Sequence, residues 1–134
     1  MGMKADKVHE VIEEGIVYIG FYLNRKKKYI KAKNGTTEHK MNERASVIKS
    51  VNGKNFRVLA YFILPNTTKS CIEHLESGMK IELEKVYTHI GNDHFVLKNN
   101  KQEMIEFAKI AILTGAKICD QMGWKRDIAF FKIS

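Results

Sequence analysis

The stretch that most restricts the fold is FRVLAYFIL, residues 56–64, which is apolar at all but one position. Successive side chains of a strand point to opposite faces of a sheet, so a strand of this composition has to be covered on both faces. Pro65 follows and cannot donate a backbone hydrogen bond within a sheet. We therefore expect a central strand that ends here, with other elements packed on each side of its sheet.

Two segments before this stretch have the alternating pattern of half-buried strands. In residues 16–23 the odd-numbered positions are all apolar, and in residues 29–33 aliphatic side chains occupy the even-numbered positions. A hairpin of these two strands would bring the other side chains to one face of the sheet. That face would carry three tyrosines and two lysines: Tyr18, Tyr22, Tyr29, Lys31 and Lys33.

The turn between the two segments is strongly basic, and so is the whole chain. There are 23 Lys and Arg residues against 15 Asp and Glu residues, which gives a formal net charge of +8. An excess of this size raises the local concentration of polyanions, so nucleic acid is the leading class of partner. The alternative is a basic protein whose lysines are only solvated. The candidate nucleic-acid-binding residues are Arg25, Lys26, Lys27, Lys28, Tyr29, Lys31 and Lys33.

Three further segments have the pattern of helices. Residues 39–51 and residues 72–90 repeat apolar side chains at steps of three and four. A third helix begins after Asn100, where Asn100 and Glu103 have the spacing of a capping box. Residues 105–113 are apolar around most of this helix, which predicts burial either in its own domain or against a second copy of the chain.

The simplest fold that accommodates these elements is a single α+β domain over residues 1–134. We expect a small central antiparallel sheet of about three strands flanked by helices. An extra C-terminal helix and a short final strand at residues 128–133 would complete the domain. Residues 92–97 form either another short strand or an ordered loop.

Several other classes of protein are disfavoured. No apolar run approaches the roughly 20 residues needed to span a bilayer, and the N-terminal residues lack the apolar centre of a secretory signal. Cys71 and Cys119 have no partners at metal-ligand spacing, and the histidines are scattered, which argues against a zinc site. We expect a cytosolic protein with reduced thiols that does not bind membranes.

Five short segments of the chain contain candidate catalytic residues and occur in a characteristic order. They are GIVYI at 15–19, KNGTT at 33–37, Arg44, Glu73 and DHF at 93–95. Their order, across a hairpin, a helix, a strand and a second helix, resembles that of the GIY-YIG endonuclease family, in the divergent branch common in phages and large viruses. The resemblance implies a GIY-YIG-like core over residues 15–97 and leaves residues 98–134 as a C-terminal helical extension.

The chain departs from the family pattern at several positions. Asn34 stands where the family has isoleucine, and Ser77 stands where the branch often has histidine. Lys33 takes the place of the family's second tyrosine, as lysine does in the divergent branch, and Tyr29 is out of register with it. These departures mean that the resemblance favours the fold of the family more than its activity.

The resemblance also implies roles for individual residues. Tyr18 would be the general base or the group that orients the attacking water, Arg44 the phosphate clamp, and Glu73 the ligand of one Mg²⁺ or Mn²⁺ ion. Nearby cations would favour the phenolate form of Tyr18, and a planar guanidinium matches a phosphate. Glu76, three residues after Glu73, is an alternative ligand, and His39 lies near the proposed site. Each of these residues can also be explained without a catalytic role. Tyr18 would then be an ordinary strand tyrosine, and the charged residues would be solvated surface side chains.

Three functions are therefore compatible with the sequence. The first is a DNA-binding, Mg²⁺-dependent endonuclease that hydrolyses phosphodiester bonds. The second is a catalytically inactive relative that only binds nucleic acid, with DNA as the expected form. The third is an interaction protein, such as a homodimer formed through the C-terminal helix.

Overall fold

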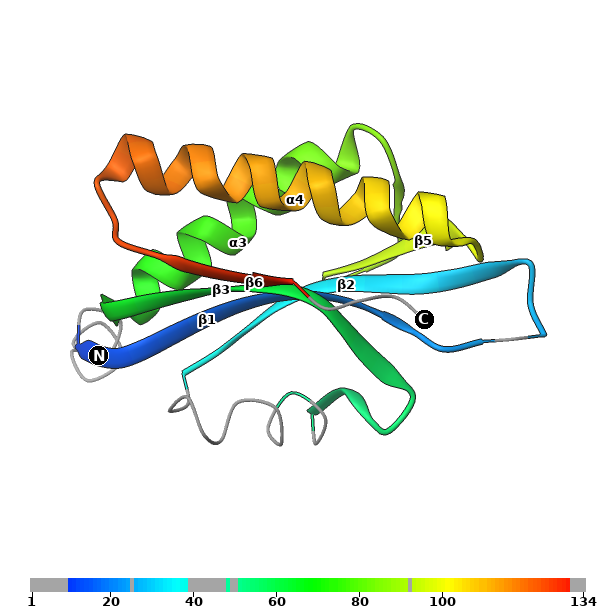
Figure 1. The fold of residues 1–134 in the computed structure, drawn as a ribbon, viewed down its shortest axis with the longest axis horizontal. Helices are drawn as coiled ribbons and strands as arrows, with labels where there is room; N and C mark the ends of the chain where they lie inside the picture. Colours follow the sequence, from blue (N-terminus) through cyan, green and yellow to red (C-terminus); the bar gives the residue numbers. More distant parts are fainter. Residues whose placement is uncertain (1–9, 25, 39–47, 49–50, 92, 131–134) are drawn as a thin grey trace.

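The computed structural model describes residues 10–24, 26–38, 48, 51–91 and 93–130, and the element labels are those of Figure 1. The described elements include two long helices and six strands. In chain order they are β1 (Val11–Tyr22), β2 (Tyr29–Thr37), β3 (Phe56–Thr68), α3 (Lys69–Glu84), β4 (Thr88–His89), β5 (His94–Lys98), α4 (Lys101–Met122) and β6 (Asp127–Phe130).

The strands form one six-stranded sheet in the order β4-β5-β2-β1-β3-β6, and every neighbouring pair is antiparallel. The expectation of a small sheet of about three strands flanked by helices is therefore wrong, although the fold is still α+β. The three expected strands lie at the centre, in the order β2-β1-β3. Two of the additional strands, β5 and β6, pair with the outer sides of β2 and β3, where a three-stranded sheet would leave backbone groups unpaired, and β4 pairs with β5.

β3 continues beyond the proline that was expected to end it. Pro65 lies within β3, opposite Glu14 of β1, and the strand ends only at Thr68. Proline is tolerated here because β6, the other neighbour of β3, pairs only with residues 60–63, so a missing N–H on that side breaks no ladder bond. The hydroxyl of Thr68 then accepts a hydrogen bond from the backbone N–H of Cys71 and caps α3.

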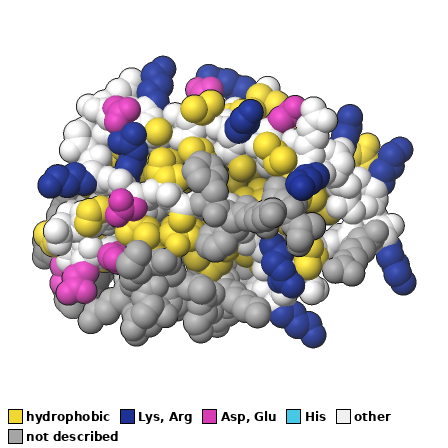
Figure 2. All heavy atoms as spheres, viewed as in Figure 1, with side chains coloured by type: hydrophobic (Ala, Val, Ile, Leu, Met, Phe, Trp, Pro, Cys, Tyr) yellow, Lys and Arg dark blue, Asp and Glu magenta, His cyan; other side chains and the backbone are white. Residues whose placement is uncertain are grey.

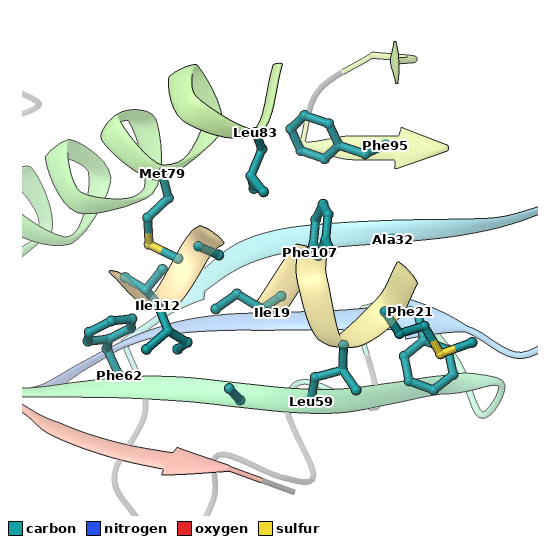
Figure 3. Close-up of a cluster of buried hydrophobic side chains, with 14 of the residues drawn as sticks. Ile19, Phe21, Ala32, Leu59, Phe62, Met79, Leu83, Phe95, Phe107 and Ile112 are labelled. Atoms are coloured by element: carbon teal, nitrogen blue, oxygen red, sulfur yellow. The ribbon is translucent and has the colours of Figure 1, made fainter. Parts of the chain in front are cut away.

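Both helices lie on the same face of the sheet (Figure 1). The main hydrophobic core fills the space between them and the odd-numbered side chains of β1, which confirms the alternation expected for residues 16–23. Figure 3 shows this core from the inside. Its fully buried members include Val17, Ile19, Phe62, Leu75, Met79, Leu83, Phe95 and Phe107.

The opposite face of the sheet is also covered at its centre. A second buried cluster consists of Ile16, Tyr18, Ile48, Phe56, Tyr61 and Ile63. Because residues 59–64 of β3 are buried from both sides, the prediction that this apolar stretch is covered on each face is confirmed. Most of the helix expected at residues 39–51 lies outside the described residues; within it, Ile48 is buried and residue 51 is helical.

α4 begins where its sequence predicts, after Asn100. The side chain of Asn100 accepts a hydrogen bond from the backbone N–H of Glu103, and Gly123 ends the helix with a left-handed φ of 70°. Packing against α3 and the sheet accounts for the buried face of α4, while Ile105, Leu113 and Met122 are exposed. None of the described helices is sufficiently long and apolar to traverse a bilayer.

Candidate functional site

A pocket of about 390 Å³ opens where β1, β2 and α3 meet. Of the residues singled out in the sequence, it brings together Tyr18, Lys33, Glu73 and Glu76. Arg44, His39 and Arg25 lie outside the described residues. The complete lining is Tyr18, Lys33, Gly35, Thr36, Val51, Glu73, Glu76, Ser77 and Asp93.

Tyr18 reaches the pocket because its partner in the sheet is a glycine. Tyr18 of β1 lies opposite Gly35 of β2. A Cβ atom added to Gly35 would lie 2.6 Å from both Cζ and Oη of Tyr18, which is closer than real contacts allow. The tyrosine ring therefore crosses β2 at Gly35, because any other residue would have a Cβ atom in the space that the ring occupies. This steric requirement explains the glycine of KNGTT.

The Tyr18 hydroxyl is held in a buried position. Only 2% of the residue is exposed, and the hydroxyl oxygen accepts a hydrogen bond from Nδ2 of Asn52 at 2.9 Å. Burial raises the pKa of Tyr18, and the nearby carboxylates of Glu76 and Asp93 add to the rise, whereas the hydrogen bond from Asn52 opposes it. This direction is opposite to the one a phenolate base requires. It suits a neutral hydroxyl that orients a water or a phosphate oxygen.

Asn52 connects the polar residues of this face. Its Oδ1 accepts a hydrogen bond from Nζ of Lys33 at 2.8 Å, and the same oxygen lies 3.4 Å from the hydroxyl of Tyr22. The Tyr22 hydroxyl in turn lies 3.2 Å from Nε2 of His94. The side chain of Asn52 thus holds Tyr18 and Lys33 beside each other at the pocket wall, a role that nothing in its sequence context indicates.

The carboxyl groups of Glu76 and Asp93 lie next to each other in the pocket. Burial raises the pKa of Glu76 to about 8, and a hydrogen bond with Asp93 and the charge of Asp93 raise it further, while Thr36 and Lys33 oppose the rise. Near neutral pH the carboxyl group of Glu76 is therefore mostly protonated. Glu73, one turn earlier on α3, is exposed at the rim of the same pocket.

Asn34 positions this carboxyl pair. It is fully buried, and its Nδ2 donates a hydrogen bond to the backbone carbonyl of Glu76 at 3.1 Å. Its backbone N–H donates to the carbonyl of Asp93 at 3.2 Å. The departure from isoleucine at this position therefore has a local reason, because Asn34 joins α3 and the residue before β5 to β2. Its Oδ1 has no hydrogen-bond partner among the described residues.

The carboxyl groups of the pocket are the kind of ligands that Mg²⁺ prefers. Within the part of the chain that the structure describes, no three His, Cys, Asp or Glu side chains are close enough to hold a metal ion by themselves. Mg²⁺ is commonly bound through one or two carboxylates, with waters and substrate oxygens completing its shell. Glu76 and Asp93 fit that requirement once the carboxyl group of Glu76 has lost its proton, and Glu73 lines the same pocket and is available to contribute.

The candidate nucleic-acid-binding residues do not all lie in the pocket. Lys33 lines it, whereas Tyr29 and Lys31 lie farther along β2 and are exposed, as are Lys26, Lys27 and Lys28 in the turn before it. Figure 2 shows Lys and Arg side chains around the end of the molecule where this turn and β5 lie. The basic surface is thus separate from the pocket and adjoins it through β2.

Comparison of the chain with family models, curated proteins and solved structures found no match. The assignment of the site therefore depends on the residues themselves. Nothing in the sequence pointed to Asn52, and Thr36 and Asp93 were named only as parts of the KNGTT and DHF signatures. The position of the DHF signature was the one signal that could have identified Asp93 as a partner of the glutamates on α3.

Proposed function

We propose that this protein is a Mg²⁺-dependent endonuclease that hydrolyses phosphodiester bonds in DNA. The observation that carries the proposal is that Tyr18, Gly35 and Glu73, which come from three separate elements and were selected by one family pattern, line a single pocket. A cytosolic location belongs to the proposal. Cys71 and Cys119 are free thiols, as is typical of proteins in reducing compartments.

The pocket would divide the chemistry between its two sides. Glu76 and Asp93, with Glu73 at the rim, would hold the Mg²⁺ or Mn²⁺ ion, which when bound supplies charge stabilisation at the phosphoryl group. On the other side, Lys33 would attract a phosphate oxygen, and the hydroxyl of Tyr18 would orient the attacking water. The hydrogen bonds from Asn52 to Tyr18 and from Lys33 to Asn52 fix these two groups before substrate binds.

The test is cleavage of supercoiled plasmid by the purified protein with Mg²⁺ or Mn²⁺. We expect Glu76→Gln and Tyr18→Phe each to lower the nicking rate by about a hundredfold, the usual effect of removing one preorganised polar group. Glu82→Gln is a matched control, because this glutamate is also on α3 but pairs with Lys85 at the surface. Comparing Glu73→Gln with Glu76→Gln identifies the main ligand. Equal background nicking by all the proteins would overturn the proposal.

A second candidate is a domain that binds nucleic acid without cutting it. The burial of the Tyr18 hydroxyl and its raised pKa favour this alternative, because a group with 2% exposure has little direct access to substrate. Such a domain would bind DNA with an affinity that falls as salt rises, since phosphate contacts displace counterions. Binding that survives Glu76→Gln, with no cleavage in either metal, would select this function over the first.

A further inference from the structure

The sheet has a face beyond the pocket to which the proposed endonuclease reaction assigns no role. β2 and β5 pair so that Tyr29 lies opposite Lys98, Lys31 opposite Val96, and Lys33 opposite His94. Residues that lie opposite each other share a face of the sheet. The intervening side chains are buried toward the helices, so these six residues are on the face turned away from α3 and α4.

The end of this face that contains Tyr29, Lys31 and Lys98 combines an exposed ring with positive charge. Tyr29 is 51% exposed, and Lys31 and Lys98 on either side of it are exposed as well. Neither β2 nor β5 contains an Asp or a Glu. A polyanion that lay along these two strands would therefore find lysines and one accessible aromatic ring, without a carboxylate from either strand to repel it.

The basic turn beside Tyr29 is held in place by one side chain. Nδ2 of Asn99 donates hydrogen bonds to the backbone carbonyls of Asn24 at 2.7 Å and Lys27 at 2.9 Å. The backbone N–H of Asn99 donates to the carbonyl of Lys28 at 2.9 Å. The turn is thus fixed to the end of β5, which keeps Lys27 and Lys28 next to Tyr29 and reduces the entropy that binding must overcome.

A second aromatic surface lies between Tyr29 and the pocket. The rings of Tyr22 and His94 are stacked, with centroids 5.7 Å apart and planes inclined by 28°. Burial lowers the pKa of His94, and the charge of Lys33 lowers it further, so this imidazole is neutral at physiological pH. Aromatic rings and lysines therefore continue along β2 from its exposed end to the pocket.

We propose that this face binds single-stranded DNA, with a base stacked on Tyr29 and phosphates held by Lys31, Lys98 and the lysines of the turn. The further step, that the bound strand leads into the pocket, rests on the proposed function. An exposed tyrosine on a flat sheet offers a stacking surface to unpaired bases, whereas in a duplex the faces of the bases are already stacked on one another. Charge alone would not distinguish the two forms.

The length of the face sets the expected footprint. Tyr29 and Gly35 lie on the same face of β2, and six strand residues at about 3.3 Å each span about 20 Å. This length corresponds to roughly six nucleotides at the spacing of about 3.4 Å that they have in one strand of a duplex. Such a site is within the range of known single-strand binding surfaces, which is about 4–16 nucleotides.

The experiment is fluorescence anisotropy in EDTA with a labelled oligothymidylate longer than this footprint, and with a blunt duplex of equal length. We expect Tyr29→Ala to weaken single-strand binding by about five- to a hundredfold, which corresponds to loss of one stacked base. Tyr29→Phe keeps the ring and should bind like the wild type. Lys31→Ala and Lys98→Ala should lower both affinity and the salt dependence, whereas Lys85→Ala, on the helix side, should not.

Unchanged single-strand binding by Tyr29→Ala would overturn the proposal, and so would an equal loss of duplex binding. Because Tyr29 is half-exposed, an unchanged thermal unfolding curve confirms that the variant is folded. EDTA prevents metal-dependent cleavage, so this result is independent of the plasmid assay. Single-strand binding without nicking would remove the endonuclease proposal alone, and nicking without a Tyr29 effect would remove the binding proposal alone.

Discussion

Both faces of β1 are buried, but the side chains on the two faces make different kinds of contact. On the face under the helices, Val17 and Ile19 belong to the main hydrophobic core. On the other face, the ring of Tyr18 packs edge-on against that of Phe56, with centroids 5.9 Å apart, while its hydroxyl accepts a hydrogen bond from Asn52. The first face holds the domain together by excluding water, whereas the second fixes polar groups at a pocket.

This difference predicts that stability and function separate between the faces. Truncating a side chain under the helices leaves a cavity, and its cost grows with the volume lost. Removing a hydroxyl group on the other face lowers the free energy of unfolding only by the net contribution of one hydrogen bond, although it changes the chemistry of the pocket. The variants below test this separation, beginning with the largest expected change.

Phe107→Ala should cause the largest loss of stability. Phe107 is fully buried, and its ring contacts those of Tyr87 and Phe95, with centroids 5.2 and 5.6 Å away. We expect the free energy of unfolding, measured by urea denaturation, to fall by about 3–5 kcal/mol. Leu113→Ala is the control on the same helix, since Leu113 is 70% exposed, and it should change stability by less than about 0.5 kcal/mol. Similar losses for both variants would contradict the burial of this face.

Gly35→Ala should cause an intermediate loss, because the new methyl group would overlap the ring of Tyr18. Overpacking of this kind costs about 1–3 kcal/mol. The cause can be isolated by repeating the substitution in a Tyr18→Ala background, where the ring is gone and the methyl group has room. We expect the cost of Gly35→Ala to shrink there, as contacting residues are not additive. Equal costs in the two backgrounds would show that the ring does not cross Gly35.

Tyr18→Phe should affect stability less and function more. The ring keeps its packing against Phe56, and only the hydrogen bond from Asn52 is lost, which costs about 0.5–1.5 kcal/mol. The measurement is the urea midpoint beside the plasmid-nicking rate of the same preparation. A destabilisation as large as that of Phe107→Ala would make this side of β1 a packing surface like the other and remove the contrast between them.

The sequence predicted the faces of β1 and β2 correctly because the alternation of a strand is a local property. It did not predict the size of the sheet. The expected short final strand overlaps β6, and the segment at residues 92–97, left open as strand or loop, contributes to β5. β4 was not expected, because its two residues are too few to show a period, and it is a strand because β5 offers it backbone partners.

The candidate site, like the sheet, was predicted only in part from the sequence. The pattern selected Tyr18 and Glu73, which line the pocket, but it gave Glu73 preference over Glu76 as the metal ligand. Which glutamate points deeper depends on how α3 is rotated on the sheet, and that rotation is set by buried residues such as Ile72, Leu75 and Met79. The partnership of Glu76 with Asp93 depends on β5 pairing with β2, a contact between distant segments that no local pattern contains.

The smallest expected effect is a pH dependence of stability that comes from the pocket side alone. The pKa of Glu76 is raised from its ordinary value of 4.5 to about 8 in the folded protein, so between these values the folded state binds more protons than the unfolded state. The contribution of Glu76 to stability is therefore complete below about pH 4.5 and is lost as the pH rises toward about 8. Solvent screening reduces the effect on stability, because the carboxyl group of Glu76 is partly solvated.

Thermal unfolding in EDTA across this pH range would measure the effect. The stability of the wild type relative to Glu76→Gln should decline as the pH rises, because glutamine cannot titrate. Asp93→Asn should reduce this decline without abolishing it, since burial, the largest cause of the raised pKa, remains. Parallel curves for the wild type and Glu76→Gln would mean that folding does not raise the pKa of Glu76, and the pocket would then lose the titrating group that sets it apart from the main hydrophobic core.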